Sequence, residues 1–141
     1  MVLAFRNLTI TPDEPVAVWP TEAVAAALER GDLNHWQRIA AELRREPWGR
    51  IARQLEEVLT YCRPYGVAEL MERALAHARQ RAELAERAEV AEEVRRLIEL
   101  SGLSRAEFAS RIGTSRTRLS TYATGKVTPS AALMVRMRCL G

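Results

Sequence analysis

The chain has 141 residues and a formal net charge of +3, and 48% of its residues are hydrophobic. A chain of this length and composition can bury a core, which excludes an intrinsically disordered protein. The charge is unevenly divided: residues 1–100 hold 14 basic and 17 acidic residues, whereas residues 101–141 hold seven basic residues and one acid. This basic end favours a localised anionic partner, of which nucleic acid is the commonest.

Catalysis, metal binding and membrane insertion find little support in the sequence. Cys62 and Cys139 are isolated thiols, and the neighbours of His35 and His77 suggest neither a nucleophile nor a metal site. The sequence lacks eighteen consecutive apolar residues and a signal-peptide pattern. We therefore expect a cytoplasmic protein with no catalytic residues, no metal or other cofactor and no membrane partner.

Residues 1–20 combine prolines with β-branched residues such as Thr9 and Val16. Proline lacks the N–H group that regular ladders and helix interiors require, and Pro12, Pro15 and Pro20 interrupt the segment. We expect an extended N-terminal arm over residues 1–20, with room for one short strand.

Apolar residues at helical spacing predict three short helices after this arm. They span residues 21–30, 33–45 and about 48–61. Three tryptophans, Trp19, Trp36 and Trp48, are expected to anchor this small bundle, with a ligand pocket as the alternative. The turn YCRPYG at residues 61–66 follows, and its two tyrosines are expected to pack in the core rather than to form a partner surface.

Residues 67–101 contain neither glycine nor proline and predict one long helix. Alanine, glutamate and arginine dominate it, and pairs such as Glu83 and Arg87 stand four residues apart. Its apolar positions drift around the helix, which disfavours a long coiled coil. We expect its first half to pack on the N-terminal helices and its last three turns to pack on a C-terminal domain, with a break near residues 87–90 left open.

Two short helices joined by a tight turn follow the long helix. Ser104 and Glu107 form an S-x-x-E pattern, which predicts a capping box at the start of the first helix. Gly113 can end that helix in the left-handed conformation, and Thr114 or Ser115 caps the next helix at once. Two helices joined by about three residues cross at a steep angle, which is a helix-turn-helix geometry.

The second of these helices has one buried and one polar face. At about 100° per residue, Tyr122 and Ala123 share the buried side of Leu119. The opposite side carries no acid and presents Arg116, Thr117, Arg118, Ser120 and Thr121. Arginine can bind guanine O6 and N7 in the major groove, and threonine can contact base edges or a thymine methyl group. This face therefore predicts contact with double-stranded DNA.

The run GLSRAEFASRIGTSRTRLSTYATGKVTPS, within residues 92–138, resembles the XRE family, the Cro and phage-repressor type of helix-turn-helix protein. The resemblance implies base reading by Arg116, Thr117 and Thr121, to which the exposed face adds Ser120. It implies contacts to DNA phosphates from Arg105, Ser115, Arg118, Thr124 and Lys126.

Two departures from the family pattern affect the core and the dimer. Many relatives pair a buried arginine with a glutamate, whereas Ile98 and Ala123 occupy those positions here; we interpret this as a compensated apolar replacement. A last helix is predicted from Thr128-Pro129 onward, and no residues remain after Gly141 for the family's usual fifth helix. Because that region commonly dimerises, we expect the N-terminal helices or the long helix to supply the dimer contact.

The predicted fold is all-α, with an N-terminal helical bundle joined by a long helix to a C-terminal repressor-like helix-turn-helix domain. Its parts are the arm over 1–20, a helical dimerisation or partner domain over 21–88 and a DNA-binding domain over 89–141. The predicted function is a sequence-specific transcription regulator that reads the major groove as a homodimer on a palindromic operator. Two alternatives stay open: an antitoxin that binds its toxin through residues 21–88, and an adaptor that does not bind DNA. An effector bound by residues 21–88 is a further expectation.

Overall fold

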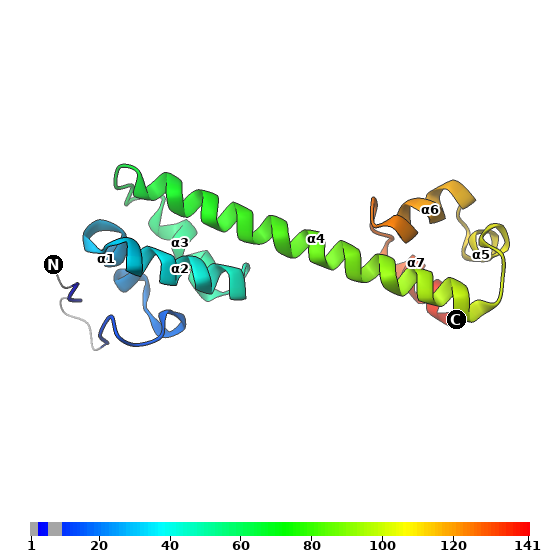
Figure 1. Ribbon diagram of the computed structural model, residues 1–141, viewed down its shortest axis with the longest axis horizontal. Coiled ribbons are helices and arrows are strands. Elements are labelled where there is room, and N and C mark those ends of the chain that lie inside the picture. The colour runs from blue at the N-terminus through cyan, green and yellow to red at the C-terminus, as the bar shows by residue number, and fades with distance from the viewer. Residues whose placement is uncertain (1–2, 6–9) are drawn as a thin grey trace. The chain divides into compact units, whose positions relative to one another are not determined.

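The computed structural model describes residues 3–5 and 10–141, and the regular structure of these residues is helical (Figure 1). The predicted all-α fold class is confirmed. The chain divides into two compact units, Met1–Ala82 (unit 1) and Glu83–Gly141 (unit 2). The predicted boundary after residue 88 lies further along the same helix, and the roles assigned to the predicted domains stay predictions.

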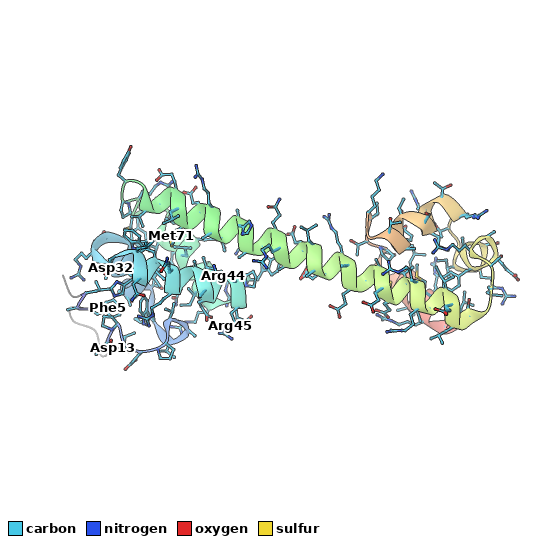
Figure 2. All side chains as sticks on the ribbon, viewed as in Figure 1. Phe5, Asp13, Asp32, Arg44, Arg45 and Met71 are labelled. Atoms are coloured by element: carbon cyan, nitrogen blue, oxygen red, sulfur yellow. The ribbon has the colours of Figure 1, made fainter. Side chains whose placement is uncertain are left out.

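Unit 1 contains three short helices and the beginning of a long one. The helix α1 spans Thr21–Arg30, α2 spans Leu33–Arg45, α3 spans Arg50–Val58 and α4 spans Val67–Ser101. The first two helices have the predicted bounds, whereas α3 is shorter than the predicted 48–61. Asp32, labelled in Figure 2, begins α2 because its carboxylate accepts the N–H of His35 at 3.3 Å. This hydrogen bond lowers the pKa of the Asp32 carboxyl.

Trp19 lies at the centre of the unit 1 core and is fully buried. Phe5 meets its ring edge to face with a centroid distance of 5.1 Å, and the Arg38 guanidinium lies 5.3 Å from the ring centroid. From α4, Met71 is buried in the same core (Figure 2). Trp36 is partly buried, and its indole N–H donates to the Ala27 carbonyl at 2.9 Å.

The described residues before α1 are hydrogen-bonded to the helices that follow. Residues Val16–Val18 form a 3-10 turn, η1, and two arginines donate hydrogen bonds to carbonyl groups of this segment. Arg38 donates to Pro12 at 2.7 Å and to Glu14 at 2.9 Å, and Arg50 donates to Ala17 at 3.3 Å and to Trp19 at 3.2 Å. Residues 3–5 and 10–20 contain no strand, and Thr9 lies outside the described residues. Burial of Trp19 therefore ties the segment to the bundle.

The aromatic residues of the turns are more exposed than the sequence predicted. Trp48 is 47% exposed, Tyr61 is 63% exposed and Tyr65 is fully exposed. The prediction that both tyrosines pack in the core is wrong, and so is the prediction that Trp48 anchors the bundle, because Trp48 does not belong to the core of unit 1. Cys62 is the residue of this turn that is buried. Successive side chains of a tight turn cannot all face one core, and the small thiol occupies the inward position.

The long helix α4 continues through residues 87–90 and contributes side chains to both cores. Ala68, Met71, Leu75 and Ala78 belong to the core of unit 1, whereas Val94, Leu97 and Ile98 belong to the core of unit 2. The side chains of residues 83–89 are all exposed. The predicted long helix and the division of its packing between two domains are therefore confirmed.

Unit 2 packs three short helices against the last turns of α4 (Figure 1). The helix α5 spans Arg105–Ile112, α6 spans Arg116–Thr124 and α7 spans Ala131–Leu140. The fully buried side chains at the centre of this core are Val94, Phe108, Leu119 and Met137. Each short helix thus contributes at least one large apolar residue to a common core.

Side-chain and backbone contacts define both ends of α5. Ser104 Oγ accepts the N–H of Glu107 at 3.2 Å, but the Glu107 carboxylate accepts from Arg111 at 3.2 Å. Among the bonds described for unit 2, only the serine half of the predicted capping box is therefore present. Gly113 ends α5 with φ +81°, as predicted, and Arg136 of α7 donates to the Ile112 carbonyl at 3.1 Å.

Candidate nucleic-acid interface

The helix α6 is held on unit 2 by its buried side and by both of its ends. Leu119, Tyr122 and Ala123 are buried, as the helical spacing predicted. Ser115 Oγ accepts the N–H of Arg118 at 3.1 Å and caps the first turn. Gly125 ends the helix with φ +81°, and a Cβ there would lie 3.5 Å from the Ala91 side chain of α4. The opposite face of α6 is therefore presented in one fixed orientation.

The positions that depart from the family pattern lie in one apolar core. Ile98 of α4 and Ala123 of α6 are both buried there, in keeping with an apolar replacement of an ion pair. Arg95, one turn before Ile98, donates a short hydrogen bond to the Ala123 carbonyl. A guanidinium group thus satisfies a carbonyl near the C-terminus of α6, where the helix dipole favours positive charge.

Six of the predicted DNA-contacting residues line one shallow hollow of about 450 Å³ on the outer side of α6. They are Arg116, Thr117, Ser120, Thr121, Thr124 and Lys126. All of these side chains are exposed except that of Thr121, which is half-buried. The hollow therefore contains all four predicted base-reading residues and two of the predicted phosphate contacts.

The other three predicted phosphate contacts lie outside this hollow. Ser115 and Arg118 are exposed at the start of α6, and Arg105 is exposed in the first turn of α5. The two helices therefore begin with exposed arginines that point away from the buried core of unit 2.

The seven basic residues after residue 100 fall into two groups. Three of them have partners: Arg111 pairs with Glu107 at 3.2 Å, Arg138 pairs with Glu93 at 2.9 Å and Arg136 binds the Ile112 carbonyl. The Arg138 guanidinium lowers the pKa of the Glu93 carboxyl. In the described part of the chain, the other four form no ion pair: Arg105, Arg116, Arg118 and Lys126. These four are the basic residues predicted to contact DNA.

The hydroxyl groups of the interface differ in a way that helical spacing did not indicate. The Thr121 hydroxyl donates to the Arg118 carbonyl at 2.6 Å, and the Thr124 hydroxyl donates to the Thr121 carbonyl at 3.2 Å. In the described structure, the side chains of Thr117 and Ser120 make no such bond. Thr117 and Ser120 therefore have free donors for base edges, whereas the Thr121 proton is already used within the helix.

Val127 is a residue of this region that the sequence did not single out. Its side chain is 48% exposed, and its backbone N–H donates to the Thr121 carbonyl at 3.2 Å. A valine in a short turn gives no signal of its own, because the same residue type also fills cores. Only the folded turn places it beside α6.

The structure offers little chemistry for catalysis in the residues it describes. Burial raises the pKa of the Cys62 thiol to about 11, and the thiol also donates to the Glu29 carboxylate at 3.3 Å. A thiol that stays protonated at neutral pH is a poor nucleophile. In residues 3–5 and 10–141, no cluster of three or more His, Cys, Asp or Glu could hold a metal ion. No helix of the same residues is long and apolar enough to cross a membrane.

Comparison with known proteins identifies the C-terminal third of the chain. Residues 94–138 match the family model described as helix-turn-helix. The match begins in the last turns of α4, includes α5 and α6 and ends within α7. It confirms the resemblance of this segment to the XRE family of DNA-binding transcription regulators. No curated protein and no solved structure matches the chain.

Proposed function

We propose, from the helix-turn-helix match of residues 94–138, that the protein is a sequence-specific transcription regulator whose helix α6 reads the major groove of DNA. Arg116, Thr117, Ser120 and Thr121 would contact bases. Arg105, Ser115, Arg118, Thr124 and Lys126 would contact phosphates. Phosphate contacts fix the orientation of such a protein on the duplex, and base contacts supply its sequence preference.

The observation that carries this proposal is the lack of partners of four basic residues in the described chain: Arg105, Arg116, Arg118 and Lys126. The other basic residues of the same segment bind acids or a carbonyl group. A basic group without an internal partner can replace the counterions of a phosphate, and the release of those counterions drives binding to DNA. Arg116 and Lys126 line the hollow on α6, Arg118 lies in the first turn of α6, and Arg105 lies in the first turn of α5.

We infer a homodimer whose contact lies in unit 1. Tyr61 and Tyr65 are exposed on the turn before α4, and tyrosine is enriched in protein interfaces because it has a large apolar body and a polar tip. The same surface could bind a second protein, in keeping with a partner for residues 21–88. Two copies would place two α6 helices about 34 Å apart, on successive major grooves.

Selection of bound fragments from random DNA, followed by footprinting, tests this function. We expect two half-sites in inverted orientation whose centres are about 10 base pairs apart. A protein that binds all fragments equally, or none of them at modest ionic strength, would rule out sequence-specific regulation.

Two variants separate base reading from phosphate binding. Arg116→Ala should weaken binding to the selected site by about 1–3 kcal/mol and relax its sequence preference, because a bidentate contact to guanine is lost. Lys126→Ala is the matched control, and it should weaken binding to selected and random DNA by similar factors. Titrations by fluorescence anisotropy on both DNAs provide the measurement.

Unchanged affinity of both variants on both DNAs would contradict the proposed interface. Circular dichroism spectra like that of the parent would show that neither variant has lost its fold. Since both side chains are exposed, we expect no such loss.

A further inference from the structure

Val127 lies in the turn that follows α6, between the exposed Lys126 and the buried Pro129. A single exposed valine is common on protein surfaces and carries no argument by itself. The position of Val127 is informative, because Val127 directly follows Lys126, which lines the hollow on α6. The exposed Val127 side chain thus directly follows, in the chain, a surface that carries hydroxyl, guanidinium and ammonium groups.

A backbone hydrogen bond joins this turn to the base-facing side of α6. The N–H of Val127 donates to the Thr121 carbonyl at 3.2 Å, and the Thr124 hydroxyl donates to the same oxygen. Thr121 itself lines the hollow. The bond holds the backbone of Val127 close to the carbonyl group of Thr121.

The side chain of Thr121 offers its methyl group rather than its hydroxyl proton. The hydroxyl donates to the Arg118 carbonyl at 2.6 Å, which turns it toward the helix backbone. Of the two groups on the Thr121 Cβ atom, the hydroxyl is thus hydrogen-bonded and the methyl group is not. Thr121 and Val127 together provide three methyl groups, and we call this pair the methyl patch.

We propose that the methyl patch reads the 5-methyl groups of thymine in the major groove. Thymine is the only standard base with a methyl group on that edge, and apolar side chains recognise it by direct contact. This inference rests on the proposed function, because it assigns part of the same DNA-binding surface. It divides that surface into a polar part, Arg116, Thr117 and Ser120, and an apolar part at the C-terminal end of α6.

Replacement of thymine by deoxyuridine tests the methyl patch without changing the protein. Deoxyuridine keeps the hydrogen-bonding groups of thymine and lacks only the methyl group. Each thymine of the selected site is replaced in turn in a synthetic duplex. At one or two positions per half-site, we expect the Kd of the full chain to rise about fourfold, the factor that corresponds to one methyl group removed from contact.

Protein variants identify which residues read the methyl group. Val127→Ala and Thr121→Ser each remove methyl groups, and each should bind the parent site more weakly and lose its sensitivity to deoxyuridine at one position. Thr121→Val is the matched control, because it keeps a methyl group and removes only the hydroxyl. It should remain sensitive to deoxyuridine. If a protein variant no longer responds to deoxyuridine, the protein change and the DNA change are energetically coupled in a double-mutant cycle. Such coupling is expected for groups in direct contact.

The outcomes separate this inference from the proposed function. Sequence-specific binding that changes less than twofold with every deoxyuridine would overturn the methyl patch alone. Equal sensitivity of the parent chain, Val127→Ala and Thr121→Ser would place the methyl contact elsewhere and would overturn it too. Failure to select any DNA sequence would overturn the proposed function together with this inference.

Discussion

Ile98 and Ala123 show how two positions can differ from a family pattern without damage to a core. Both are buried in the same cluster, at positions where the resemblance to the XRE family implies an arginine and a glutamate. A buried ion pair gains little over a well-packed apolar pair, because both charges must leave water. A single charge at either position has no such compensation.

The pairing of these two residues can be tested by a double-mutant cycle. Ile98→Arg should lower the free energy of unfolding by about 3 kcal/mol, because a guanidinium group becomes buried without an acid. Adding Ala123→Glu should restore about 1 kcal/mol or more of that loss through the new ion pair. Urea denaturation of the parent and the three variants measures the coupling. Strictly additive effects would show that the two side chains do not meet.

The three short helices of unit 2 begin in the same way. Ser104, Ser115 and Ser130 each accept the N–H of the residue three positions later, at 3.2, 3.1 and 3.2 Å. Each bond satisfies one of the N–H groups that the first turn of a helix leaves unpaired. Of the three, Ser115 lies at the start of α6, where the helix N-terminus can also receive a phosphate.

Ser115→Ala and Ser130→Ala form a matched pair of cap variants. Each should lower the free energy of unfolding by about 1 kcal/mol. Only Ser115→Ala should also weaken binding to the selected DNA, because it changes the orientation of α6 and removes a predicted phosphate contact. Thermal unfolding followed by a DNA titration gives both quantities. A similar loss of DNA affinity in Ser130→Ala would mean that stability, not the interface, explains the effect.

At the scale of the whole molecule, the two units have separate cores, and α4 contributes to both. The solvent-exposed residues 83–89 lie between these two contributions. All three tryptophans belong to unit 1, so that tryptophan fluorescence reports on that unit alone. Tryptophan fluorescence therefore follows the unfolding of unit 1, whereas circular dichroism records the helices of both units.

Phe108→Ala tests whether the two cores unfold independently. Phe108 is fully buried in unit 2, and its truncation should destabilise that unit by about 3–5 kcal/mol. We expect circular dichroism to detect an earlier unfolding transition, while the tryptophan transition keeps the midpoint of the parent. An equal shift of both signals would show that the units unfold as one cooperative body.

The sequence by itself determined the all-α fold, the bounds of α1, α2 and α4, the serine cap of α5 and the glycine that ends α5. It also identified the face of α6 on which the four base-reading candidates gather. These features depend on residues within a few positions of one another. Helical periodicity, cap residues and glycine conformations are local properties, and a sequence displays them directly.

Only the tertiary structure decided which basic side chains form ion pairs or hydrogen bonds within the protein and which do not. Arg138 finds Glu93 across 45 residues of sequence, and Arg136 finds the Ile112 carbonyl across 24. Such pairings distinguish the basic residues that bind an acid or a carbonyl group from the basic residues that have no partner within the described chain. The same holds for the exposure of Tyr65 and Val127, which depends on how the helices on either side of their turns pack. A side chain's partners and solvent exposure are set by the packing of remote segments, which local patterns do not encode.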